Sequence, residues 1–284
     1  MIESPGAQTS RCSPSESSEG AVPAGDLRMY FQVRGHEEGV PLIMIMGLGG
    51  HTLDWGWTLP QELEKRYRII MFDNRGAGRS QQPAGPYTIA RMALDTMNLM
   101  DRLGLEKANI FGVSMGGMIA QRMAIDQPDR VMKLILGCTS PGGADQIKAP
   151  PEILQYFEPR KDLELCDALW WAAPAGFTHE FIRDHPDVVA RKNRSNMGYP
   201  CSLEAYNSQL DAYRSFSAGG GLSDIRSPTL VMAGSSDILI PPENSRILAE
   251  RIPGAVLRMI EGAGHLFWIS HPHETLTAIR EFLG

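Results

Sequence analysis

The stretch ANIFGVSMGGMIA (residues 108–120) decides the fold expected for this chain. An apolar run typical of a buried strand, residues 108–113, leads directly into Ser114, and an apolar helical pattern over 115–126 follows at once. Glycines at positions 112 and 116 remove Cβ atoms that would clash in so sharp a strand-to-helix turn. Ser114 is therefore expected at a helix N-terminus, with its hydroxyl exposed above the sheet and free N–H groups close by.

Short apolar runs alternate with amphipathic stretches on both sides of this segment. Several of the runs are almost wholly apolar, as expected for strands buried on both faces of a parallel sheet. The chain is therefore predicted to be an α/β protein with a mostly parallel central sheet flanked by helices. The predicted strands are 27–33, 42–46, 68–72, 108–113, 131–138, 229–233 and 256–260, and the predicted helices are 58–65, 89–103, 115–126, 242–251 and 272–282.

Two segments depart from this alternation. Residues 1–25 are rich in Ser, Pro, Gly and Glu, which predicts a flexible tail. Residues 141–225 contain short helical patterns and no convincing strand, which is too much chain for a simple loop. We expect this insertion to form a helical lid over the carboxyl edge of the sheet, between core segments 26–140 and 226–284. Its helix starts are predicted at Pro151, Asp162, Thr178, Pro186 and Ser202.

Bulk properties exclude several classes of partner. The 284 residues carry a net charge of -6, so no basic field favours nucleic acid. The chain shows no secretory signal and no apolar run near the ~20 residues of a membrane span, which predicts a soluble cytoplasmic protein. Four widely spaced cysteines favour free thiols, and neither a metal nor a cofactor is predicted. The oligomeric state is left open.

Two further residues are expected to activate the serine. A hydroxyl is a poor nucleophile until a base removes its proton. His265 follows Gly262-Ala263-Gly264 in a small-residue loop before the last helix, where an imidazole can project over the sheet edge. Asp237 ends a strand and its turn between Ser114 and His265 in chain order, whereas the rival strand offers only Asp145, already inside the insertion. Ser114, His265 and Asp237 are predicted as nucleophile, base and orienting acid.

Acyl transfer also needs N–H donors for the oxyanion. One is expected from Met115, the residue after the nucleophile, and the other from the loop Gly47-Leu48-Gly49-Gly50, where Leu48 N–H is preferred. A merely flexible glycine loop is the alternative interpretation.

These residues resemble the α/β-hydrolase superfamily over essentially the whole chain from Asp26 to Gly284. Residues 72–80, FDNRGAGRS, look like the family segment D-x-R-G-x-G-x-S, in which Asp73 and Arg75 have a structural role. The resemblance is closest to the lidded serine esterase, enol-lactonase and C–C hydrolase branch, although Met46-Gly47 stands where many members have His-Gly. Ser114 argues against the relatives that use an aspartate nucleophile.

The resemblance implies a serine hydrolase that cleaves a carboxylic ester of a small, largely apolar substrate through an acyl-enzyme intermediate. Gly47, Trp170, Trp171, Leu239 and Phe267 are predicted to line the substrate pocket. Cleavage of a C–C bond or an enol-lactone is the first alternative. A ligand receptor that keeps the triad without turnover is the second.

Overall fold

The computed structural model describes residues 17–284 and is built on an eight-stranded sheet in the order β1-β2-β4-β3-β5-β6-β7-β8. β2 pairs antiparallel with β1 and with β4, and all other neighbours are parallel. The predicted α/β fold with a mostly parallel sheet is confirmed. The strands are β1 (Ser17–Ala24), β2 (Leu27–Arg34), β3 (Val40–Ile45), β4 (Tyr67–Phe72), β5 (Ala108–Val113), β6 (Val131–Gly137), β7 (Thr229–Gly234) and β8 (Val256–Ile260).

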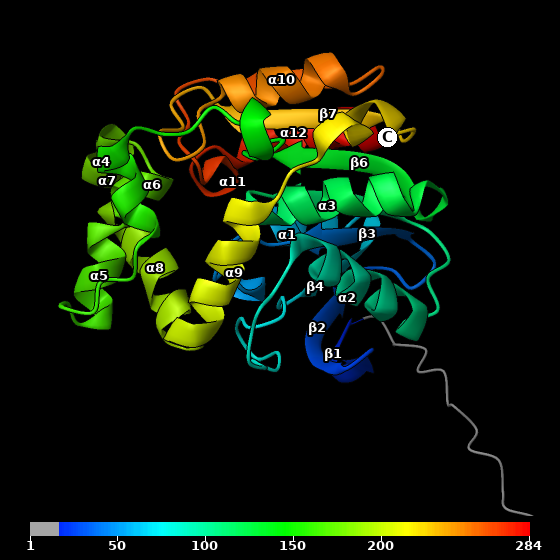
Figure 1. The fold of residues 1–284 in the computed structure, drawn as a ribbon, viewed down its shortest axis with the longest axis horizontal. Helices are drawn as coiled ribbons and strands as arrows, with labels where there is room; N and C mark the ends of the chain where they lie inside the picture. Colours follow the sequence, from blue (N-terminus) through cyan, green and yellow to red (C-terminus); the bar gives the residue numbers. More distant parts are fainter. Residues whose placement is uncertain (1–16) are drawn as a thin grey trace, which may run out of the picture.

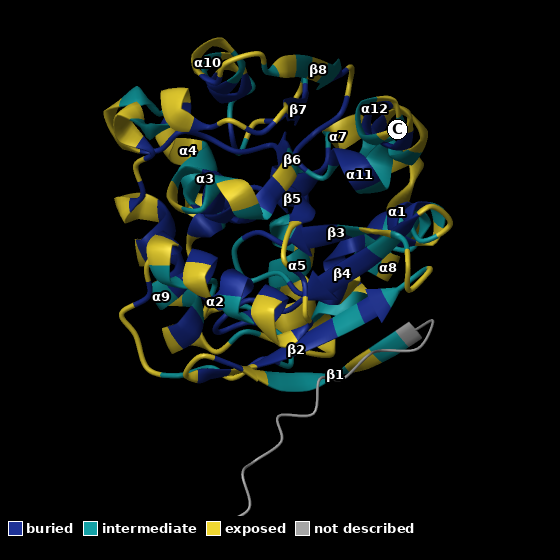
Figure 2. Ribbon diagram, turned by 90° about the vertical axis from the view of Figure 1, so that its right-hand side faces the viewer, coloured by how far each residue is buried: buried dark blue, intermediate teal, exposed yellow. Residues whose placement is uncertain are grey.

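Helices cover both faces of this sheet because its strands present apolar side chains on both. On β5, Ile110 packs into one core cluster and Phe111 into the other. Buried residues accordingly concentrate on the strands and exposed ones on the outer surfaces of the helices (Figure 2). The first cluster takes α2 (Ile89–Arg102), α3 (Met115–Asp126) and α10 (Glu243–Arg251), and the second takes α1 (Thr58–Leu63), α11 (Phe267–Ser270) and α12 (Pro272–Leu283).

The chain between β6 and β7 is helical, and much of it lies to one side of the sheet (Figure 1). The predicted helix start at Asp162 is wrong: α5 begins at Leu165, since Asp162 pairs with Arg160 instead of capping a helix. The segment holds α4 (Pro151–Leu154), α5 (Leu165–Trp171), α6 (Ala173–Gly176), α7 (His179–Asp184), α8 (Pro186–Met197) and α9 (Leu203–Ser215). Short 3-10 turns complete the fold: η1 (Thr52–Trp55), η2 (Pro128–Arg130), η3 (Gly143–Asp145), η4 (Gln155–Phe157) and η5 (Gly219–Asp224).

The predicted flexible tail needs a correction. Residues 17–24 form β1, which pairs with β2 along its whole length. A tight turn at Gly25, where φ is +66°, connects the two strands. The polar composition misled the prediction because backbone hydrogen bonds to β2 hold this edge strand, and Glu19 adds a contact by accepting from the Tyr30 hydroxyl at 2.6 Å. The remainder of the predicted tail, residues 1–16, lies outside the described residues.

Two features bear on the bulk predictions. Within residues 17–284 no helix is both long and apolar enough to cross a membrane. Cys138, Cys166 and Cys201 are free thiols, and Cys12 lies outside the described residues.

Candidate active site

Ser114 stands at the sharp turn between β5 and α3. Its φ of 55° and ψ of -125° are unusual for a residue with a side chain and cost of order 1–3 kcal/mol. The surroundings hold this conformation: Ser114 N–H donates to Gly137 O at 2.9 Å, and its carbonyl accepts from the Thr139 hydroxyl at 2.7 Å. A Cβ at Gly116 would lie 2.1 Å from Ile45 O, so the turn requires glycine there.

His265 and Asp237 form a buried hydrogen-bonded pair. His265 Nδ1 lies 2.7 Å from Asp237 Oδ2, and the two residues are 6% and 3% exposed. The other carboxylate oxygen, Oδ1, accepts from the backbone N–H groups of Leu239 and Ile240, each at 2.9 Å. The carboxylate is therefore fixed in orientation, and it holds the imidazole with Nδ1 toward the acid and Nε2 away from it.

The pair shifts the protonation of the imidazole. Burial is the largest single influence and disfavours the charged imidazolium, but Asp237 and Cys138 together outweigh it, so the pKa of His265 lies well above its ordinary value of 6.5. A histidine with a raised pKa binds a proton more strongly than free imidazole does, so it stays charged to a higher pH.

Cys138 lies against this pair and was not singled out from the sequence. It is fully buried at the end of β6 with φ +40°, and one ligand atom each from Cys138, Asp237 and His265 lie within 4.8 Å of one another. Burial raises the pKa of its thiol, which stays protonated. A direct hydrogen bond joins the His265 imidazole and the Asp237 carboxylate, so we assign the Cys138 thiol to packing around that pair. In the sequence, the one feature noted near Cys138 was that no carboxylate directly follows the strand.

The glycine loop after β3 lies directly against the serine. A Cβ at Gly47 would be 2.9 Å from Ser114 Cβ and 3.3 Å from its Oγ. Gly49 N–H donates to Gln209 Oε1 at 2.7 Å, so this amide is occupied. In contrast, Leu48 N–H and Met115 N–H donate no hydrogen bond to any part of the chain between residues 17 and 284. Two free donors therefore flank the hydroxyl.

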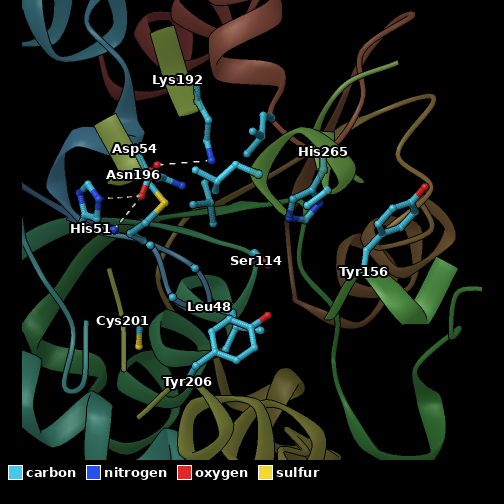
Figure 3. Close-up of a pocket in the computed structure, with 18 of the residues that line it drawn as sticks. Leu48, His51, Asp54, Ser114, Tyr156, Lys192, Asn196, Cys201, Tyr206 and His265 are labelled. Atoms are coloured by element: carbon cyan, nitrogen blue, oxygen red, sulfur yellow. Dashed lines mark hydrogen bonds and ion pairs between the residues drawn. The ribbon is translucent and has the colours of Figure 1, made fainter. Parts of the chain in front are cut away.

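A cavity of about 370 Å³ opens in front of Ser114 and His265 (Figure 3). Its lining is mainly apolar, as expected of a small-molecule site. Of the predicted pocket residues, Gly47 and Leu239 line it, together with Leu48. The other apolar and aromatic lining residues include Met46, Val113, Tyr156, Phe157, Leu165, Leu169, Ala172, Tyr199, Tyr206, Leu266 and Trp268.

Three predicted pocket residues lie elsewhere. Phe267 is fully buried in the core cluster under α11, and its neighbour Trp268 lines the cavity instead. Trp170 is 38% exposed and does not line the cavity. Trp171 lines a neighbouring cavity and packs against Tyr156, with ring centroids 4.8 Å apart. α5 turns Leu165 and Leu169 toward the cavity, so both of its tryptophans face elsewhere.

Four polar lining residues were also missed: His51, Asp54, Lys192 and Asn196. They come from η1 and its preceding residue and from α8, which are far apart in the chain. His51 lies in an early loop, where a histidine is ordinarily at the surface, yet it is 2% exposed. The spacing of Lys192 and Asn196, four residues apart on one helix face, was the available signal.

Comparison with known proteins agrees with this architecture. A family model described as the alpha/beta hydrolase fold matches residues 40–272. The chain is 32% identical over 267 residues to the "Putative carbamate hydrolase RutD" of Caulobacter sp. (strain K31), covering 90% of this chain and 95% of that protein. It is 33% identical over 244 residues to the poly(3-hydroxyalkanoate) depolymerase of Ectopseudomonas oleovorans, covering 86% and 84%.

A further relative is 3-oxoadipate enol-lactonase 2 of Acinetobacter baylyi (strain ATCC 33305 / BD413 / ADP1), 28% identical over 251 residues and covering 88% of this chain and 90% of that protein. Among solved structures, a hydrolase from Pseudomonas aeruginosa PA01 superposes with a TM-score of 0.81 at 26% identity. That match covers 94% of this chain and 98% of the other.

Proposed function

The chain belongs to the α/β-hydrolase fold family, and on that premise we propose that it is a serine hydrolase that cleaves a carboxylic ester of a small, largely apolar substrate. Its relatives and fold make it a hydrolase. The choice of a serine mechanism and of the ester bond is the proposal. The observation that carries it is the strained Ser114, facing the same cavity as a histidine that is hydrogen-bonded at 2.7 Å to a buried carboxylate.

The proposed reaction follows from the positions of these groups. His265 Nε2 takes the proton as Ser114 Oγ attacks the acyl carbon, and Asp237 stabilises the imidazolium that forms. Leu48 N–H and Met115 N–H donate to the oxyanion of the tetrahedral intermediate. The imidazolium then protonates the departing alkoxide, leaving an acyl-enzyme. Water, deprotonated by the same histidine, attacks the ester and releases the acid.

The helical segment 141–225 is proposed to act as a lid. Residues of η4, α5, α8 and α9 line the cavity above Ser114, so a substrate must pass them to reach the hydroxyl. Excluding water there would strengthen the hydrogen bonds to the oxyanion. A cytoplasmic location stays a prediction.

The test compares wild type with Ser114→Ala on short p-nitrophenyl esters. We expect a fall in kcat/KM by roughly four orders of magnitude or more, because the attacking atom is lost. Ser140→Ala is the matched control, since Ser140 is equally buried nearby but does not line the cavity. Wild-type turnover in Ser114→Ala would refute the assignment. Absence of both ester turnover and fluorophosphonate labelling in wild type would favour a receptor.

Hydrolysis of an enol-lactone is the second candidate, supported by the likeness to an enol-lactonase. The same attack at an acyl carbon would open the ring instead of releasing an alcohol. A panel of esters, lactones, carbamates and vinylogous diketones decides between them. A kcat/KM for lactones or diketones far above that for simple esters would replace the leading proposal.

A further inference from the structure

One side of the otherwise apolar cavity is polar. His51, Asp54, Lys192 and Asn196 gather there, whereas His265 lies on the other side, with Ser114 between (Figure 3). The group joins the loop after β3 to α8 of the inserted segment. Polar groups in such a position cost free energy unless they are hydrogen-bonded. A donor among them that has no acceptor in the protein therefore indicates what a ligand could supply.

Asp54 is the fixed member of this group. It is 5% exposed, and its Oδ2 accepts from His51 N–H at 2.9 Å. The backbone carbonyl of the same residue accepts from Trp268 Nε1 at 3.0 Å. His51 Nδ1 in turn accepts from Leu53 N–H at 3.3 Å. Nδ1 is thus an acceptor, whereas Nε2 is buried 3.8 Å from Asp54 Oδ2 without a hydrogen-bond partner among the described residues.

Lys192 reaches the same carboxylate from α8. Its Nζ lies 3.6 Å from Asp54 Oδ1. The Asn196 amide bridges the two in the one orientation that satisfies both neighbours, in which its nitrogen donates to Asp54 and its oxygen lies 2.7 Å from Lys192 Nζ. An ammonium has three N–H donors, and these two contacts leave one without an acceptor in residues 17–284. The side chain is 16% exposed and lines the cavity, which is where an acceptor can enter.

The charges on this side of the cavity already balance. The Lys192 ammonium faces the Asp54 carboxylate, and a substrate carboxylate would add a second anion to a poorly solvated site. An uncharged oxygen can accept from Lys192 without disturbing that balance.

We propose that this polar group is a specificity site for an uncharged acceptor oxygen, such as a ketone carbonyl, carried by the substrate away from its scissile bond. Lys192 Nζ donates to that oxygen. The proposal rests on the proposed hydrolase function and specifies the substrate as an oxo-substituted acyl ester. The competing interpretation is that these residues only hold α8 against η1 and make no contact with the substrate.

Three p-nitrophenyl esters of similar chain length separate these interpretations: hexanoate, 5-oxohexanoate and the monoester of glutarate. We expect wild-type kcat/KM to favour the oxo ester over hexanoate by about tenfold or more, as a hydrogen bond to a charged donor would give. In Lys192→Met that ratio should fall toward one. Arg194→Met, which removes an exposed cation from the same helix, should keep it.

A second variant and a binding measurement guard against failure of folding or of turnover. Lys192→Gln removes the charge but keeps an amide N–H donor group, so it should retain part of the preference. Quenching of the intrinsic tryptophan fluorescence, to which the cavity-lining Trp268 contributes, by 5-oxohexanamide and hexanamide measures the same preference without catalysis.

The outcomes are distinct. No turnover of any ester contradicts the proposed function, while the amide affinities still test the specificity site. Turnover without preference for the oxo compound, or a preference kept in folded Lys192→Met, overturns the site. Preference for the glutarate monoester overturns its uncharged character.

Discussion

The two oxygens of the Asp237 carboxylate have separate tasks. Oδ1 accepts two backbone N–H groups, which hold the side chain, and Oδ2 faces His265 Nδ1. This division explains how a buried loop histidine keeps one orientation. It also sets the proton affinity of the imidazole, because the carboxylate lies at hydrogen-bond distance in a buried site.

The first prediction concerns pH. General-base catalysis requires neutral His265, so kcat/KM for an ester should rise with pH as the imidazolium loses its proton. Since the pKa of His265 is raised by Asp237, the midpoint should lie above the ordinary 6.5 and not at it. A pH–rate profile of the wild type measures this directly. A midpoint at or below 6.5 would show that the carboxylate does not dominate the environment of the histidine.

The second prediction removes the charge of that carboxylate. Asp237→Asn should lower kcat by about four orders of magnitude, because an amide no longer enforces the correct tautomer. Any residual activity should show its midpoint at lower pH than in wild type, since the raising charge is gone. Asp224→Asn, an exposed position in η5, is the control and should leave both quantities unchanged.

The third prediction uses the contact between Gly47 and the serine. An alanine Cβ there would lie 2.9 Å from Ser114 Cβ, so the hydroxyl or the loop must shift. We expect Gly47→Ala to reduce kcat/KM by about 100-fold, as misplacement near 1 Å does, with little loss of stability. Gly220→Ala, whose Cβ would meet nothing within 4 Å, serves as the control. Full activity in Gly47→Ala would mean that the loop does not constrain the nucleophile.

At this scale the sequence predicts residues whose chemistry is local. Ser114 is marked by its turn, and His265 by its small-residue loop, so both could be placed without a structure. Lys192 and Cys138 could not, because their significance arises from neighbours that only tertiary packing supplies. The same limit explains why Phe267 was chosen for the pocket in place of Trp268.

Among the elements, hydrophobic periodicity predicted the interior strands and the flanking helices well. β5 and α3 lie at the predicted bounds because their apolar runs are unbroken. β1 was missed because an edge strand is held by backbone pairing, which leaves no apolar pattern. The predicted caps located α7 and α9. The side chains of Thr178 and Ser202 accept hydrogen bonds from backbone N–H groups in the first turns of these helices.

The fourth prediction concerns the connection between α9 and the active-site loop. Gln209 is fully buried; its Oε1 accepts from Gly49 N–H at 2.7 Å and its Nε2 donates to Arg75 O at 2.7 Å. Gln209→Leu should leave both backbone groups unsatisfied and cost about 1–3 kcal/mol in the free energy of unfolding. We also expect a lower kcat, because the loop that carries Leu48 N–H loses its support.

Urea denaturation and ester kinetics measure these two effects. Asn207→Leu, at an exposed position of the same helix, should change neither. A variant as stable and active as wild type would show that α9 does not fix the glycine loop.

On the scale of the whole molecule, the carboxyl ends of β3, β5, β7 and β8 bring distant segments to one edge. Parallel strands end together, so the loops after them supply the glycine loop, Ser114, Asp237 and His265. The order of these segments in the chain was enough to predict this arrangement. How the inserted helices lie on that edge depends on side-chain contacts between parts remote in sequence.

The last prediction concerns the ion pairs that join the loop after β4 to α2 and to the β1–β2 turn. Arg75 is 6% exposed and donates to Asp95 on α2, from Nε at 2.7 Å and Nη2 at 2.8 Å, and to Asp26 in the β1–β2 turn at 2.7 Å. Arg75→Met leaves the buried Asp95 carboxylate with only the partly exposed Arg91, whose Nε lies 3.2 Å from its Oδ1, so it should cost about 3 kcal/mol in the free energy of unfolding, the lower end of the range for a broken buried pair. The double variant Arg75→Met/Asp95→Leu should recover most of that loss because no buried carboxylate remains. Arg122→Met is the control: it removes an exposed ion pair with Asp126 and should change stability by about 0.5 kcal/mol or less. Urea denaturation followed by circular dichroism measures all three; a double variant no more stable than Arg75→Met would mean that packing and backbone contacts, and not the ion pair, carry the stabilisation.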